Sequence, residues 1–140
     1  MRDYFLYTDG GSRGNPGPSA AGIVLLDPDK KVIKKGGKYL GKGTNNLAEY
    51  QALILGLKIA LELGIKNLVC FLDSELLVKQ LNGLYKVKSP NLIKSFADIK
   101  KMERQFDYIK YEHVKREKNS EADAMVNLTL DKFESKSHEE

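Results

Sequence analysis

Four acidic residues stand where predicted strands and helices of the chain begin or end, which is where α/β domains gather their chemistry. Asp9 and Asp73 each end an apolar strand, whereas Glu49 and Asp123 lie in the first turns of two predicted helices. If the two strands are parallel neighbours, both aspartates lie at one edge of the sheet, and both helix starts can reach it. Four carboxylates in one place repel each other, and one of them takes up a proton unless cations are present.

Two divalent cations would remove this repulsion. Hard oxygen ligands favour Mg²⁺ or Mn²⁺ over Zn²⁺, and the sequence has no cluster of Cys and His at zinc spacing. Two such ions ~3.5–4 Å apart activate a water molecule on one and stabilise the leaving oxygen of a phosphodiester on the other. Each acid also has an ordinary explanation as a turn or helix-cap residue, but four separate caps need not converge.

The elements that would position these acids follow in the order β-β-β-α-β-α-α-β-α. Strands are expected over residues 4–8, 20–26, 31–39, 67–72 and 106–114, and helices over 44–64, 74–83 and 91–105 and from 120. Tight turns make the first three strands antiparallel, and the helices before and after the fourth strand allow parallel crossovers. We therefore expect an α/β domain over residues 1–130, with a mixed five-stranded sheet flanked by helices, and a charged, frayed tail over 131–140.

The net charge of +4 is unevenly distributed. Residues 28–43 hold six lysines against one aspartate, and residues 84–118 hold ten basic against five acidic residues. These blocks form either an anion-attracting surface or a solvated lysine face. No apolar stretch is long enough to span a membrane, the first residues lack a signal-peptide layout, and Cys70 has no partner for an internal disulfide. We expect a cytoplasmic protein without a membrane partner.

Four segments of the chain together closely resemble the type 1 ribonuclease H family. They read YTDGGSRGNPGPSAAG, GTNNLAEYQAL, LDSELLVKQLNG and KREKNSEADAMVN, and with their order and spacing they cover roughly residues 3–130. The resemblance implies that family's five-stranded mixed sheet. It also implies a metal-dependent endonuclease that cuts the RNA strand of RNA–DNA hybrids with two Mg²⁺ ions, leaving 5′-phosphate and 3′-hydroxyl ends.

The resemblance also implies roles for individual residues. The catalytic metal ligands would be Asp9, Glu49, Asp73 and Asp123. Substrate contacts would come from Gly10, Gly11, Ser12, Asn15, Lys42, Thr44, Asn45, Ser74, Lys86 and Lys88. Among these, Thr44 with Lys42 matches a pocket for a phosphate of the DNA strand. The minor groove of a hybrid displays 2′-hydroxyls, and phosphate contacts read no sequence, so cleavage should be largely sequence-independent.

Three departures from the family pattern stand out. The loop KREKNSEA lacks the mobile histidine of many members; Arg116 is nearest to its position and is the expected catalytic substitute, ahead of Glu117 and Glu121. A basic, Trp-rich handle is absent, and Lys86 and Lys88 would partly replace it. Glu75 stands where Gln is frequent, and would either weaken substrate binding or face solvent. The chain is thus closer to a branch, common in archaea and some bacteria, that lacks the histidine.

Two other functions fit the same fold. One is a non-catalytic module that binds RNA–DNA hybrids or double-stranded RNA, and the other is a related nuclease or integrase acting on DNA. The four carboxylates disfavour the first, because a pure binder gains nothing from negative charge where phosphates must lie. The TNN segment and the compact domain disfavour the second. We expect a monomer that uses two Mg²⁺ ions, with Mn²⁺ as a substitute; cleavage of double-stranded RNA and the partner of Arg13, a phosphate or water, stay open.

Overall fold

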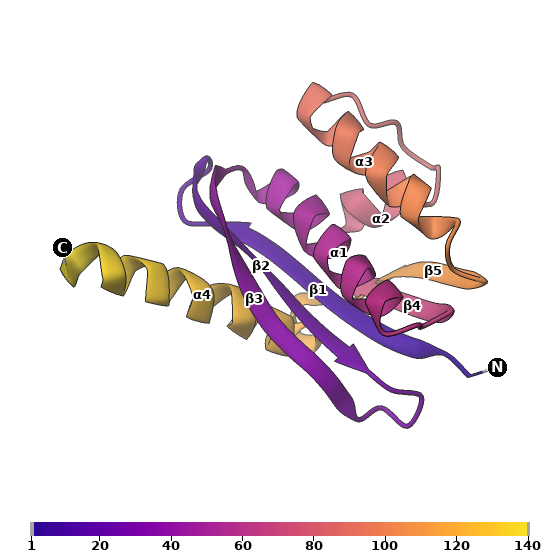
Figure 1. Cartoon of the computed structure of the whole chain (residues 1–140). Helices are drawn as coiled ribbons and strands as arrows, with labels where there is room; N and C mark the ends of the chain where they lie inside the picture. Colours follow the sequence, from indigo (N-terminus) through magenta and orange to yellow (C-terminus); the bar gives the residue numbers. More distant parts are fainter. Residues whose placement is uncertain (1, 140) are drawn as a thin grey trace.

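The computed structural model describes residues 2–139, and the side chains of residues 2–136. A five-stranded sheet in the order β3-β2-β1-β4-β5 forms its centre (Figure 1). The elements are β1 (Tyr4–Ser12), β2 (Gly17–Leu26), β3 (Val32–Gly43), α1 (Asn45–Glu62), β4 (Asn67–Leu72), α2 (Glu75–Leu81), α3 (Pro90–Glu103), β5 (Tyr108–His113), the 3₁₀ turn η1 (Arg116–Lys118) and α4 (Ser120–Glu139). The predicted order of elements is confirmed.

The pairing of the strands is mixed, as predicted. β1 to β3 form an antiparallel meander, whereas β4 is parallel to β1, and β5 is parallel to β4. α1 packs on one face of the sheet with α3 beside it, and α4 crosses β1, β2 and β3 on the other face (Figure 1). The two crossover connections therefore leave the ends of β1 and β4 side by side between α1 and α4.

The larger part of the core lies between α1 and the sheet. Leu53 and Leu57 recur at helical spacing on α1, are fully buried, and belong to one apolar cluster with Leu6 of β1 and Leu68 of β4. α1 begins after Thr44, whose hydroxyl accepts a hydrogen bond from the backbone N–H of Leu47 at 3.2 Å. This cap fixes the start of α1 at the same edge of the sheet where β1 and β4 leave their parallel pairing.

Residues 10–12, directly after Asp9, belong to the first strand and not to a turn, and this corrects the end expected for that strand; the chain bends only at residues 13–16. β1 continues to Ser12 and pairs with β2 throughout, so that Asp9 faces Gly22 and Ser12 faces Ser19. Because antiparallel pairing satisfies the backbone N–H and C=O groups, these residues need no apolar side chains to extend the strand. Asp9 therefore lies inside a rigid ribbon and not at the mouth of a loop.

The last helix runs through most of the segment that we expected as a charged tail, and the fraying of that segment stays a prediction. α4 continues as one helix through Glu139, and residue 140 lies outside the described part of the chain. The Phe133 ring stacks on Tyr39 of β3, with ring centroids 4.0 Å apart. This contact extends the packing of Val126 and Leu130 on the sheet toward the end of the helix. The domain boundary expected at residue 130 stays a prediction.

Among residues 2–139, none of the helices combines the length and apolar character that a membrane crossing requires.

We predict that Gly10→Ala destabilises the protein. A Cβ atom on Gly10 would overlap the backbone carbonyl of Ala48 in α1, and a backbone atom cannot turn aside as a flexible side chain can. We expect a loss of about 1–3 kcal/mol in the free energy of unfolding, measured by urea denaturation. Gly36→Ala is the matched control, because nothing lies within 4 Å of the added methyl group. Equal stabilities of the two variants would contradict this account of the contact between β1 and α1.

Candidate active site

Two parallel strands bring the first two acids together. The pairing of β1 with β4 ends at Thr8 and Leu72, so Asp9 and Asp73 are the next residues on adjacent strands. Glu49 reaches the same point from α1. It lies one turn further into α1 than predicted, because the helix is capped by Thr44. The expected convergence at this edge of the sheet is therefore present.

Three carboxylates form the centre of the site. Asp9, Glu49 and Asp73 each offer one oxygen, and these oxygens lie within 4.8 Å of one another. Asp9 is 7% exposed and Glu49 is 8% exposed. The Oε2 atom of Glu49 is buried and has no hydrogen-bond partner among the described residues. Buried anionic oxygens without donors are unfavourable unless a cation neutralises them, so this cluster fits a divalent metal ion.

The electrostatics of the cluster agree with this fit. Burial, followed by the nearby Asp73 carboxylate, raises the pKa of Asp9 to about 7. Burial, followed by Asp9 and Asp73, raises the pKa of Glu49 well above its ordinary value. Both effects penalise the ionised form, and a metal ion would reverse them.

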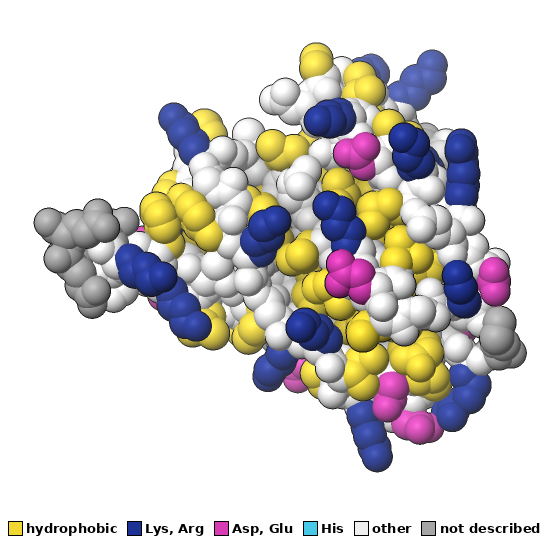
Figure 2. Space-filling view, viewed as in Figure 1, with side chains coloured by type: hydrophobic (Ala, Val, Ile, Leu, Met, Phe, Trp, Pro, Cys, Tyr) yellow, Lys and Arg dark blue, Asp and Glu magenta, His cyan; other side chains and the backbone are white. Residues whose placement is uncertain are grey.

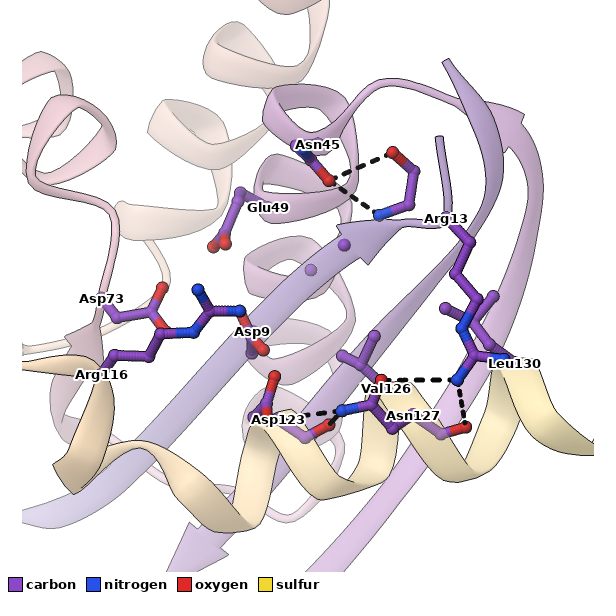
Figure 3. Close-up of a pocket in the computed structure, with 13 residues that line it drawn as sticks. Asp9, Arg13, Asn45, Glu49, Asp73, Arg116, Asp123, Val126, Asn127 and Leu130 are labelled. Atoms are coloured by element: carbon purple, nitrogen blue, oxygen red, sulfur yellow. Dashed lines mark hydrogen bonds between the residues drawn. The ribbon is translucent and has the colours of Figure 1, made fainter. Parts of the chain in front are cut away.

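Asp123 and Arg116 complete the ring of charged groups (Figure 3). Asp123 enters from the first turn of α4, as predicted, and its proximity is a further, smaller cause of the raised pKa of Asp9. Arg116 projects from η1 toward Asp73 and Asp9 (Figure 3). All of these side chains line one cavity of about 430 Å³ between β1, α1 and α4. The cavity thus presents four carboxylates and one guanidinium.

Asn119 is a site residue that the sequence analysis missed. It is 1% exposed, and its Nδ2 donates to the carbonyl of Thr8 at 2.8 Å and to Asp73 Oδ2 at 3.3 Å. The backbone carbonyl of Asn119 accepts a hydrogen bond from the backbone N–H of Asp123 at 3.1 Å. An Asn directly before a helix usually reads as a cap. Here the side chain joins the end of β1 to Asp73 after β4, while the backbone of the same residue begins α4, so Asn119 links all three segments around the carboxylates.

The predicted contact residues of the hairpin between β1 and β2 adjoin the carboxylates. Gly10, Gly11, Ser12 and Asn45 line the same cavity. The Oδ1 atom of Asn45 accepts hydrogen bonds from the backbone N–H of Ser12 at 2.8 Å and from its hydroxyl at 3.1 Å. Asn15 Oδ1 accepts the N–H of Asn45 at 3.1 Å. These bonds dock the hairpin on the first residue of α1.

A second cavity of about 310 Å³ lies beside this junction, at the N-terminal ends of α1 and α3. Its lining is Asn15, Thr44, Asn46, Ser89, Asn91 and Leu92. Ser89 and Asn91 were not predicted, because only the fold brings the start of α3 next to Thr44. Lys42 is exposed on β3 and does not line this cavity.

The remaining predicted contacts lie outside both cavities. The Ser74 hydroxyl accepts the N–H of Leu77 at 3.2 Å and so caps α2. Glu75 is exposed and pairs with Lys79 at 2.8 Å, which matches the solvent-facing alternative. Lys86 and Lys88 border a separate surface pocket, whose other lining residues are Leu76, Leu84 and Tyr85. On the face seen in Figure 2, basic side chains are spread among acidic and apolar ones without forming a single patch.

Arg13, whose partner the sequence left open, contacts α4. Its guanidinium pairs with Asp131 at 2.7 Å and with Glu134 at 2.9 Å, and it also lies against Asn127 (Figure 3). The hairpin is therefore fixed to α1 on one side and to α4 on the other.

Comparisons with known proteins agree with this geometry. The model of the family described as "Reverse transcriptase-like" matches residues 7–129. "Bifunctional protein Rv2228c" of Mycobacterium tuberculosis is 42% identical over 127 residues, which are 90% of this chain and 35% of that protein. "Ribonuclease HI" of Halobacterium salinarum is 41% identical over 125 residues, 89% of this chain and 63% of that protein. The chain thus spans less than two thirds of either relative.

Two solved structures match over nearly their whole length. The crystal structure of RNase H1 from Halobacterium salinarum superposes with a TM-score of 0.91 at 39% identity, covering 93% of this chain and 98% of that one. LC11-RNase H1 in complex with RNA/DNA hybrid superposes with a TM-score of 0.88 at 39% identity, covering 92% and 97%. The same folded unit is therefore shared along its full extent.

We predict that the metal-free protein loses stability as pH rises from about 4 to 8. The folded pKa of Asp9 lies near 7, so between these values the folded state retains a proton that the unfolded chain has released, and stability falls with rising pH. The loss is expected to be on the order of a few kcal/mol. Thermal unfolding in chelator, at pH 4.5 to 8, measures it.

Asp9→Asn isolates this effect. It should match the parent near pH 4.5 and exceed its stability at pH 8, because the amide does not ionise. Asp98→Asn, at an exposed position on α3, should keep the parent profile. Parallel profiles of the parent and Asp9→Asn would show that Asp9 is not the group responsible.

Proposed function

We propose that this chain, which belongs to the reverse transcriptase-like family of ribonuclease H-type domains, is an endoribonuclease that hydrolyses the RNA strand of RNA–DNA hybrids. The observation that carries the proposal is the trio Asp9, Glu49 and Asp73, brought within 4.8 Å by three separate elements. A structural neighbour of the same extent was crystallised with an RNA/DNA hybrid, which supports this class of substrate.

We assign the metal ligands to Asp9, Glu49, Asp73 and Asp123, with two Mg²⁺ ions as the proposed cofactor and Mn²⁺ as a substitute. Asp9 lies in the middle of the set, with Glu49 and Asp73 within 4.8 Å and Asp123 lining the same cavity, so it would hold metal together with each of them. Divalent ions, when bound, supply an activated water and offset charge on the leaving oxygen. The carboxylates would hold these ions at the rigid edge of the sheet, and the burial of Asp9 and Glu49 keeps bulk water from the inner side of both carboxylates.

The hairpin residues would meet the sugar edge of the RNA strand. Gly10, Gly11, Ser12 and Asn45 line the cavity next to the carboxylates. The wide minor groove of an A-like duplex exposes 2′-hydroxyls, which small and polar groups can approach closely. In this arrangement Glu49 would stand between the ions and a ribose 2′-hydroxyl. Such contacts recognise RNA without recognising its sequence.

The second cavity would bind a phosphate of the DNA strand. It lies where α1 and α3 both begin, and helix N-termini attract anions through their free N–H groups. Thr44 was expected near such a phosphate together with Lys42, and the fold brings Asn15, Ser89 and Asn91 to it instead of Lys42. Ser89 forms no side-chain cap with α3, so its hydroxyl can donate to a ligand. Lys42, Ser74, Lys86 and Lys88 would add only peripheral contacts.

We also propose that the chain works as a monomer in a reducing, cytoplasmic compartment. The carboxylates and both cavities are built from one chain. Cys70 is free and buried within the sheet, where a small apolar residue suffices.

A labelled-strand assay tests the function. RNA–DNA hybrid, double-stranded RNA, single-stranded RNA and double-stranded DNA are each offered with Mg²⁺, Mn²⁺ or chelator. We expect cleavage of the RNA strand of the hybrid, dependent on the metal. The cleavage rate of Asp9→Asn should fall below about 1% of the parent rate. Loss of a residue that only hydrogen-bonds to a metal ligand typically costs 10–100-fold, and loss of the ligand itself should cost more. The variant should retain hybrid binding by fluorescence anisotropy. A parent that binds the hybrid in Mg²⁺ without cutting it would be a binding module instead.

Arg116→Ala tests the proposed substitute for the missing histidine. The guanidinium faces the carboxylates from η1 (Figure 3), where it can neutralise a departing 5′-phosphate. We expect the steady-state rate to fall several-fold while single-turnover cleavage changes less, because product release is the step affected. Arg104→Ala, an exposed arginine after α3, is the control. An unchanged steady-state rate would remove Arg116 from the catalytic set.

A further inference from the structure

Asn127, in the second turn of α4, connects the hairpin to one of the four carboxylates (Figure 3). Its Nδ2 donates to Asp123 Oδ2 at 3.3 Å and to the Asp123 carbonyl at 3.2 Å. On its other side, Nη2 of Arg13 lies 3.5 Å from Asn127 Oδ1 and 3.4 Å from its backbone carbonyl oxygen. The amide therefore stands between a guanidinium and a carboxylate.

The chemistry of these two neighbours fixes the orientation of the amide. A guanidinium only donates hydrogen bonds, and an ionised carboxylate only accepts them. The amide oxygen must therefore face Arg13 and the amide nitrogen must face Asp123. The reverse orientation would place donor against donor and acceptor against acceptor, so the side chain has one favourable position.

Arg13 is itself held in place. Asp131 and Glu134 pair with its two terminal nitrogens, at 2.7 and 2.9 Å, from the following turns of α4. Its backbone N–H donates to the carbonyl of Pro18 at 2.8 Å and closes the hairpin. The guanidinium is thus anchored from the helix, and its main chain is anchored within the hairpin that lines the carboxylate cavity.

We propose that Asn127 is a positioning residue that orients the Asp123 carboxylate toward the metal ions, and that Arg13 holds Asn127 in the orientation this requires. The inference rests on the proposed function, which makes Asp123 a ligand. Asp123 is less buried than Asp9 and Glu49 and stands outside the trio within 4.8 Å. Because the Asp123 side chain is less confined by packing, a hydrogen bond from a neighbouring residue contributes more to its orientation. Loss of a residue that hydrogen-bonds to a metal ligand typically weakens metal binding 10–100-fold.

The test measures binding of Mg²⁺ alone by the folded protein, without substrate, using calorimetry or NMR titration. Asn127→Ala should weaken Mg²⁺ binding about 10-fold, with a melting temperature close to that of the parent because the side chain is exposed. Asn127→Leu keeps the volume and removes the hydrogen bonds, so it should lose as much. Leu128→Ala is the control, since this neighbour on α4 lines a different cavity and should bind Mg²⁺ like the parent.

Arg13→Ala tests the second half of the inference. It should weaken Mg²⁺ binding less than Asn127→Ala does, and the double variant should be no weaker than Asn127→Ala, because Arg13 acts through Asn127. Additive losses would overturn the role of Arg13.

Mg²⁺ binding by Asn127→Ala within 2-fold of the parent, restoration by Asn127→Leu, or a parent that binds no Mg²⁺ would overturn the role of Asn127. A parent that binds Mg²⁺ but cuts no hybrid would refute the proposed function alone, and the metal-binding comparison would still decide the inference.

Discussion

Repulsion among buried carboxylates is the constraint on which this structure depends. Three acidic side chains converge within 4.8 Å, and in a poorly solvated site their mutual repulsion acts to push the surrounding elements apart. The elements that resist belong to the most firmly held part of the molecule. β1 and β4 are central strands, and α1 is packed on them through fully buried leucines. The apolar core therefore maintains the charged site, and the site reduces the stability of the metal-free protein.

Hydrogen bonds and an ion pair around the site also hold these elements in place against the repulsion. Asn119 bonds to the backbone of β1 and to Asp73, Asn45 docks the hairpin on α1, and Arg13 docks it on α4. Each of these contacts joins segments that are far apart in the sequence. Each of the three central acids comes from a different element. The distances between their carboxylates therefore depend on how the whole domain is packed.

The sequence was sufficient to predict what depends on local pattern. Alternation and helical spacing predicted the order of strands and helices, and position at element ends singled out Asp9, Glu49, Asp73 and Asp123. The sequence did not predict features that depend on contacts between distant segments of the chain. Residues 10–12 looked like part of a turn because their glycines hide the pairing with β2. The contact of Phe133 with Tyr39 on β3 could not be read from the charged sequence around Phe133. Asn119 resembled a helix cap, and the neighbours of Asn127 could be recognised only once α4 lay against the hairpin.

The extension of β1 past its pairing with β4 has a consequence for recognition. From Asp9 to Ser12 the chain is half of a two-stranded ribbon whose backbone is already paired with β2. A flexible glycine-rich loop would lose conformational entropy each time a ligand ordered it, and that loss would reduce affinity. Here folding has already ordered the segment. A nucleic acid entering the cavity meets a surface in its final shape, and the free energy of its contacts goes into affinity.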